Sequence, residues 1–76
     1  MYVISYILLV QGKLGRHAIV GTYHSEEQAA IVARQFRENF EGTWITRSLD
    51  ARIGDGRWEL AYPEHQAVRF VCINFI

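Results

Sequence analysis

The stretch SEEQAAIVARQFRENFEG, Ser25 to Gly42, has the pattern of one amphipathic helix and decides the fold expected for the rest of the chain. At about 100° per residue, its apolar side chains fall within roughly 60° of one line, and charged side chains fall on the opposite side. One side of this helix should therefore pack on a core, and the other should face water. The apolar set is Ala29, Val32, Ala33, Phe36 and Phe40.

Residues at both ends of this stretch mark where the helix should begin and end. Ser25 suits the N-cap because its hydroxyl can accept a hydrogen bond from an amide of the first turn, and Gln28 completes a capping-box pattern. Glu26 and Glu27 add negative charge where the helix dipole favours it. Gly42 can adopt the left-handed conformation that closes a helix, so the sequence predicts one helix from Ser25 to Gly42.

Five other stretches have the apolar and β-branched composition of strands. The first and the last are the most apolar, so we expect them in the middle of a sheet. The second contains Gly21, which predicts a bulge or an edge position. The predicted strands are Tyr2 to Val10, Arg16 to Tyr23, Thr43 to Leu49, Arg57 to Tyr62 and Ala67 to Phe75.

Short links between these strands predict a mainly antiparallel arrangement. Gln11 to Gly15 has the length of a hairpin loop, Gly54-Asp55-Gly56 is a turn signal, and Pro63 should end the fourth strand. The order is strand, strand, helix, strand, strand, strand, and one helix can cover only one face of a sheet. We therefore predict an α+β fold, a single domain over residues 1–76, with a five-stranded, mainly antiparallel sheet and one helix packed on one face.

Charge and cysteine content bear on the partner and the compartment. Eight basic residues balance eight acidic ones, so no net field attracts nucleic acid or an anionic membrane. Seven of the eight basic residues are Arg, which is typical of protein interfaces and phosphate sites, or else of a base-composition bias in the source genome. Cys72 is the only cysteine, which excludes an internal disulfide and favours a cytoplasmic location.

No stretch carries a signature of catalysis, metal binding or membrane insertion. His17, His24 and His65 lack the close spacing of zinc ligands, and Cys72 lies in an apolar strand where burial disfavours the thiolate. The apolar run Tyr2 to Val10 is too short to span a bilayer as a helix and lacks the features of a signal peptide. The sequence therefore predicts a protein that is not an enzyme and has no cofactor, metal or membrane partner.

The stretch from Trp44 to Arg69 interleaves arginines with large aromatic residues. Such residues anchor protein interfaces and also build platforms for single-stranded nucleic acid, although the two Trp residues could equally lie in the core. On the charged side of the helix, Ile31 stands beside Arg34 as an exposed apolar residue. The predicted partner-binding residues are Arg47, Arg52, Arg57, Trp58 and Arg69 on the strands, and Ile31 and Arg34 on the helix.

The layout as a whole resembles that of the small phage-encoded inhibitors called anti-CRISPRs, several of which are single domains with a helix against an antiparallel sheet. The likeness runs from Tyr2 through the helix Glu26 to Phe40 to the last strand, ending at Ile76. Several of those inhibitors are strongly acidic mimics of DNA, whereas this chain is neutral and rich in Arg. The resemblance implies direct binding to a host defence complex without mimicry of duplex DNA.

These observations lead to a first hypothesis, a non-enzymatic binding protein that blocks a larger complex through a sheet face or edge. A second hypothesis is a small nucleic-acid-binding module that uses the same arginine and aromatic residues. A third is a subunit that forms a homodimer or larger oligomer, because half of the residues are apolar and so short a chain buries only about 60% of its surface.

Overall fold

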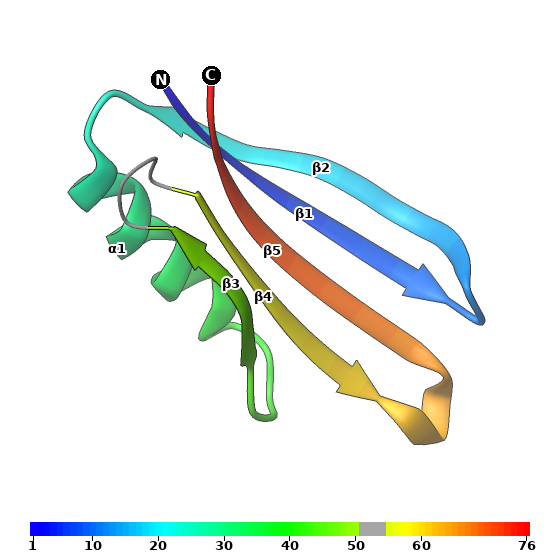
Figure 1. Ribbon diagram of the computed structural model, residues 1–76. Coiled ribbons are helices and arrows are strands. Elements are labelled where there is room, and N and C mark those ends of the chain that lie inside the picture. Colours follow the sequence, from blue (N-terminus) through cyan, green and yellow to red (C-terminus); the bar gives the residue numbers. More distant parts are fainter. Residues whose placement is uncertain (51–54) are drawn as a thin grey trace.

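The computed structural model describes residues 1–50 and 55–76 (Figure 1). The five strands form one antiparallel sheet in the order β2-β1-β5-β4-β3, and one α-helix packs on it, as the sequence predicted. The two most apolar strands, β1 and β5, are neighbours inside the sheet. The elements are β1 (Tyr2–Val10), β2 (Lys13–Tyr23), α1 (Glu26–Arg37), β3 (Ile45–Asp50), β4 (Asp55–Tyr62), the 3₁₀ helix η1 (Pro63–His65) and β5 (Ala67–Phe75).

The hairpin between β1 and β2 is tighter than the predicted loop of Gln11 to Gly15. Only Gln11 and Gly12 form the turn, with φ angles of 52° and 77°, and β2 begins at Lys13. Two consecutive residues with positive φ are typical of the turn whose twist matches that of the flanking strands. The tight turn therefore lets β2 begin at Lys13, three residues before the predicted start at Arg16.

Strand β2 lies at an edge of the sheet and carries a bulge where the sequence places Gly21. Ile4 pairs with Gly21, but the next residue, Ser5, pairs with Ile19, so that Val20 is an extra residue in β2. This irregularity confirms the prediction from Gly21, because a glycine inside a strand often marks a bulge.

Helix α1 begins as predicted but ends earlier. The Ser25 hydroxyl accepts a hydrogen bond from the Gln28 amide at 3.3 Å, which confirms the N-cap. The helix ends at Arg37, so the prediction that it continues to Gly42 is wrong. After Arg37 the backbone bonds change to the shorter i→i−3 type: the Asn39 amide donates to the Phe36 carbonyl and the Phe40 amide to the Arg37 carbonyl, each at 3.2 Å. The Asn39 side chain also donates to the Phe36 carbonyl at 3.2 Å, which satisfies an acceptor at the helix end.

Gly42 instead lies where the chain crosses strand β4. Its φ is +120°, and a Cβ atom at this position would stand 2.8 Å from Cδ1 of Leu60. A larger residue would be strained both by the backbone angle and by this contact. The predicted turn Gly54-Asp55-Gly56 lies partly outside the described residues, and Asp55 and Gly56 belong to β4, where Gly56 pairs with Ile73.

The core lies between α1 and the two central strands. Two alanines of the helix, Ala29 and Ala33, are fully buried and let the helix approach the sheet closely. The side chains of Tyr2, Val20, Val32, Phe36 and Phe40 pack around this centre and remain half-buried. The buried residues of the cluster are Ile4, Tyr6, Ala29, Ala33, Val71 and Ile73.

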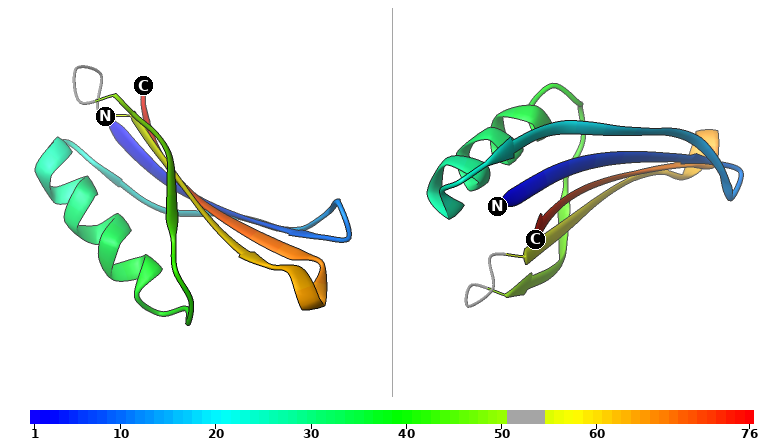
Figure 2. Two further views of the ribbon diagram at one scale, coloured as in Figure 1. Left: turned by 60° about the horizontal axis from the view of Figure 1, so that its bottom comes forward. Right: turned by 90° about the horizontal axis from the view of Figure 1, so that it is seen from above.

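The helix is too short to cover the sheet. Twelve residues of α1 span about 18 Å, whereas the nine residues of β1 span about 30 Å. Figure 2 shows the helix over the part of the sheet next to the chain termini, and the β1–β2 hairpin and the end of β4 extending beyond it. The helix side of the sheet is therefore uncovered at one end, and the other side is uncovered throughout among the described residues.

Replacement of Ile4 by Ala should lower the free energy of unfolding by about 2 to 5 kcal/mol, because the side chain is fully buried under the helix. Ile19→Ala is the matched control, since that side chain is 60% exposed, and it should cost less than about 1 kcal/mol. Urea unfolding followed by circular dichroism measures both values. Equal losses for the two variants would contradict this location of the core.

Candidate functional site

Two surfaces of the sheet remain uncovered in the described part of the chain. Residues paired directly across neighbouring strands point to the same side, so the strand register assigns each side chain to a surface. We call the surface away from α1 the open face and the uncovered end on the helix side the end groove. The open face contains Val3, Ile7, Leu9, Val68, Phe70 and Cys72, and the end groove is lined by Tyr6, Leu8, Arg16, Ile19, Phe36, Phe40 and Arg69 among others.

The centre of the open face is apolar. Ile7 of β1 lies between His17 of β2 and Phe70 of β5, and Leu9 pairs with Val68. Ile7, Leu9, Val68 and Phe70 are only half-buried, because no helix lies on this side. An apolar sheet face of this kind is typical of a surface that packs against another layer.

The charged groups of the open face are engaged within the chain. The Nε atom of Arg47 donates to the Glu59 carboxylate at 2.7 Å. The Arg57 guanidinium stacks on the Phe70 ring, with Cζ 4.5 Å from the ring centroid. These four side chains line a shallow hollow of about 410 Å³ at the β4 side of the face. Charges of both signs therefore flank the apolar centre.

Cys72 also points to the open face, in the pair with Ser5. Burial raises the pKa of its thiol above the usual value, and the nearby Arg57 guanidinium and the Ser5 hydroxyl oppose that rise. The neutral thiol therefore predominates at neutral pH, which makes Cys72 a weak nucleophile and an additional apolar group of the face.

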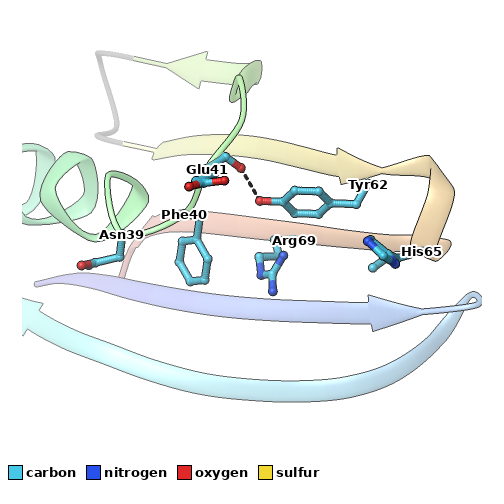
Figure 3. Close-up of a pocket in the computed structure, with 7 residues that line it drawn as sticks. Asn39, Phe40, Glu41, Tyr62, His65 and Arg69 are labelled. Carbon is cyan, nitrogen blue, oxygen red and sulfur yellow. Dashed lines mark hydrogen bonds between the residues drawn. The ribbon is translucent and has the colours of Figure 1, made fainter.

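On the helix side, Arg69 is held by three aromatic side chains. Its Nε atom donates to the Tyr6 hydroxyl at 2.9 Å. Its Cζ atom lies 4.8 Å from the Phe40 ring centroid and 5.0 Å from that of Tyr62. Figure 3 shows Arg69 between Phe40 and His65, beneath the Tyr62 ring whose hydroxyl donates to the Glu41 carbonyl. Packing therefore fixes the guanidinium with its terminal nitrogens unused by these contacts.

Arg69 separates two hollows on this side. The larger is the end groove, with a volume of about 580 Å³, which also contains Arg16. The smaller, about 420 Å³, is lined by Asn39, Glu41 and His65 (Figure 3). The end groove contains two arginines and apolar side chains, whereas the smaller hollow contains groups of both charges.

The structure distributes the residues predicted from the sequence over three surfaces. Arg47 and Arg57 lie on the open face, and Arg69 lies on the helix side at the end groove. Arg52 lies outside the described residues. The two predicted residues of the helix, Ile31 and Arg34, are exposed on the outer side of α1, where Ile31 is 40% exposed. Trp58, the remaining predicted residue, packs against the core on the helix side.

The two indole rings pack against the core from its β3 and β4 side. Trp58 is half-buried under the Arg37 guanidinium, whose Cζ atom lies 3.9 Å from the ring centroid. The indole nitrogen of Trp44 donates to the Arg37 carbonyl at 3.0 Å. Burial and the neighbouring Arg34 lower the pKa of Arg37. These contacts make Trp58 a support for the end of the helix, so it does not join Arg47 and Arg57 on one surface.

Sequence reasoning did not select Arg16 or Tyr6. Arg16 reaches the end groove because Leu8 pairs with Arg16 on one side and with Arg69 on the other. The register of β2, β1 and β5 brings Arg16 and Arg69 together, although they are 53 positions apart in the sequence. A local sequence pattern does not predict strand register of this kind. Tyr6 appears in the sequence only as one apolar position of a central strand.

Other kinds of site find no support in the described residues. No group of three or more His, Cys, Asp or Glu side chains is close enough together there to hold a metal ion. Within the same residues, no helix has the length and hydropathy needed to cross a membrane. No protein-family model, curated protein or solved structure matches the chain. Function therefore has to be inferred from the two surfaces themselves.

Alkylation of Cys72 by iodoacetamide should show a pH midpoint above that of a free cysteine thiol, because burial raises its pKa. Arg57→Gln should move the midpoint further upward, because the guanidinium charge favours the thiolate. Arg34→Gln, on the outer side of the helix, serves as the control and should leave it unchanged. The measurement is the rate of carbamidomethylation against pH by mass spectrometry, and a downward shift in Arg57→Gln would contradict the assigned environment.

Proposed function

We propose that the chain is a non-enzymatic binding protein that docks onto an apolar surface of a protein partner through the open face. The observation that carries this proposal is the row of half-buried apolar side chains around Ile7 and Phe70, on the side of the sheet that α1 does not cover. A second layer against this side would bury them, and burial of apolar area is the main favourable term in protein association.

The charges of the open face favour a protein partner over nucleic acid. Arg47 is paired with Glu59, and Arg57 is stacked on Phe70. Nucleic-acid binding gains most from unpaired cations, which neutralise phosphates and displace the counterions condensed on them, and the net charge of this chain is zero. An apolar centre with charged groups at its border instead matches the anatomy of a protein interface.

The resemblance to anti-CRISPR inhibitors supports a host defence complex as the partner. The small size of the chain and its uncovered sheet face suit a protein that acts by occupying a surface of a larger assembly. Arg57 and the apolar centre would then supply the docking contacts, and Arg47 and Glu59 would form part of the polar rim.

A second copy of the chain is the other candidate partner. A two-fold interface uses the same surface on both subunits, so that surface must complement itself. The open face meets this condition because it carries an apolar centre, and both Arg47 and Glu59 lie at its border. Two such faces would pack as the layers of a sandwich, at a spacing of about 10 Å.

The substitution Ile7→Glu should weaken docking by about tenfold or more, because it places a charge at the centre of the open face. Ile31→Glu is the matched control, with the same change of residue on the opposite side of the molecule, and should bind like the wild type. Sedimentation equilibrium over a wide concentration range measures self-association. Partners retained from native-host extract are purified and titrated against all three proteins.

Protection of Cys72 from alkylation in the complex locates the interface. A partner or a dimer that binds wild type and Ile7→Glu equally, or that leaves Cys72 unprotected, would contradict docking through the open face. If Ile31→Glu alone loses binding, the outer side of α1 is the docking surface and the present proposal is wrong.

A further inference from the structure

We infer that the end groove is a binding site for a small amphipathic organic acid, with the carboxylate between Arg16 and Arg69 and the apolar body along the helix. This site lies on the side of the sheet opposite to the open face. It is therefore independent of the proposed docking function, and either can fail without the other.

The position of the groove follows from the length of the helix. Phe36 of α1 and Phe40, which follows the helix, pack at the edge of the core. No residue of α1 lies over the next row of the sheet, which contains Leu8. In that row, Leu8 pairs with both Arg16 and Arg69, which places the two arginines on the same side of the sheet, roughly 10 Å apart at the backbone. Their long side chains can therefore converge on one group above Leu8.

The charge of the groove selects an anion. Of the described residues that line it, two are arginines and none is acidic. Neither arginine forms an ion pair with a described residue, since the ion pair found there joins Arg47 and Glu59. Arg69 is half-buried, and an anion bound beside it would meet less competition from water than at a fully exposed site.

The geometry of Arg69 favours a carboxylate that binds end-on. Its Nε atom is already hydrogen-bonded to Tyr6, so the two terminal nitrogens remain to donate in parallel. Stacking on Phe40 and Tyr62 holds the guanidinium plane in place before any ligand arrives. A group ordered in advance loses less conformational entropy on binding than a free surface arginine does.

The remaining lining selects an apolar body of limited size. The side chains of Leu8, Phe36 and Phe40 form the apolar lining together with Ala18 and Val20. The volume of about 580 Å³ lies within the range of about 300 to 1,000 Å³ that is typical of small-molecule sites. A polyanionic chain such as single-stranded nucleic acid would place most of its charges beyond these two arginines.

Phenylbutyrate tests this inference, because it joins a carboxylate to an aromatic body. It should bind the full chain saturably, as measured by amide chemical-shift titration, with the largest shifts at Leu8, Arg69 and the end of α1. Phenylbutyramide, which lacks the charge, should bind about tenfold more weakly or worse, and acetate, which lacks the apolar body, should show the same loss.

Substitutions assign the contacts. Arg69→Gln and Arg16→Gln should each weaken phenylbutyrate binding about tenfold, because each removes a charge-assisted hydrogen bond. Arg34→Gln is the matched control and should leave binding unchanged. Far-ultraviolet circular dichroism and the urea midpoint check that each variant folds, and Arg16, at an exposed edge strand, provides a variant that should leave the core intact.

Three results would overturn the inference: no saturable binding to the wild-type chain, equal affinity for the acid and its amide, or equal loss in Arg34→Gln and the groove variants. Inorganic phosphate that binds as tightly as phenylbutyrate would also overturn it, because the apolar body would then contribute nothing. Ile7→Glu should retain phenylbutyrate binding, which separates this site from the open face.

Discussion

The mismatch in length between helix α1 and the longer central strands β1 and β5 governs this structure. Residues Glu26–Arg37 provide about 18 Å of cover for strands of about 30 Å. The fully buried residues Ile4, Ala33 and Val71 are found where the two overlap. Leu60, in the row beyond the helix, is buried beside Gly42 of the segment that follows α1. The end groove lies where this cover ends, and the open face exists because no second helix is present in the described residues.

The residues of the central strand β5 differ between the side that the helix covers and the side that it leaves uncovered. On the helix side, β5 carries Ile73 and Val71 under the helix and then Arg69 where the helix stops. On the other side, the same strand remains apolar through Cys72, Phe70 and Val68 without any cover. Solvation alone would favour polar residues on the uncovered side, and these apolar residues are the basis of the proposed docking through the open face.

The fold could be predicted because its signals are local. The apolar side of the helix, the Ser25 cap and the apolar runs of β1 and β5 each depend on residues close in sequence. The end of the helix was missed because the sequence does not show that the backbone bonds shorten to the i→i−3 type after Arg37, and a glycine such as Gly42 permits a helix end without requiring one.

The candidate sites were less predictable because they depend on register. Arg69 was selected as an arginine among aromatic residues. The residues that define its role are Tyr6 in β1 and Arg16 in β2, and both are far from Arg69 in the sequence. Arg47, Arg57 and Trp58 were grouped because they are close in the chain. Strand alternation places Arg57 and Trp58 on opposite sides of the sheet, so that group is divided between two surfaces.

The same alternation makes the two surfaces separable. Ile7 and Leu8 are adjacent in β1, as are Phe70 and Arg69 in β5, but in each pair one side chain belongs to the open face and the other to the end groove. Two central strands therefore carry both surfaces without sharing a side chain. One described helix therefore leaves this sheet with two separate uncovered surfaces, and each of the two proposals rests on one of them.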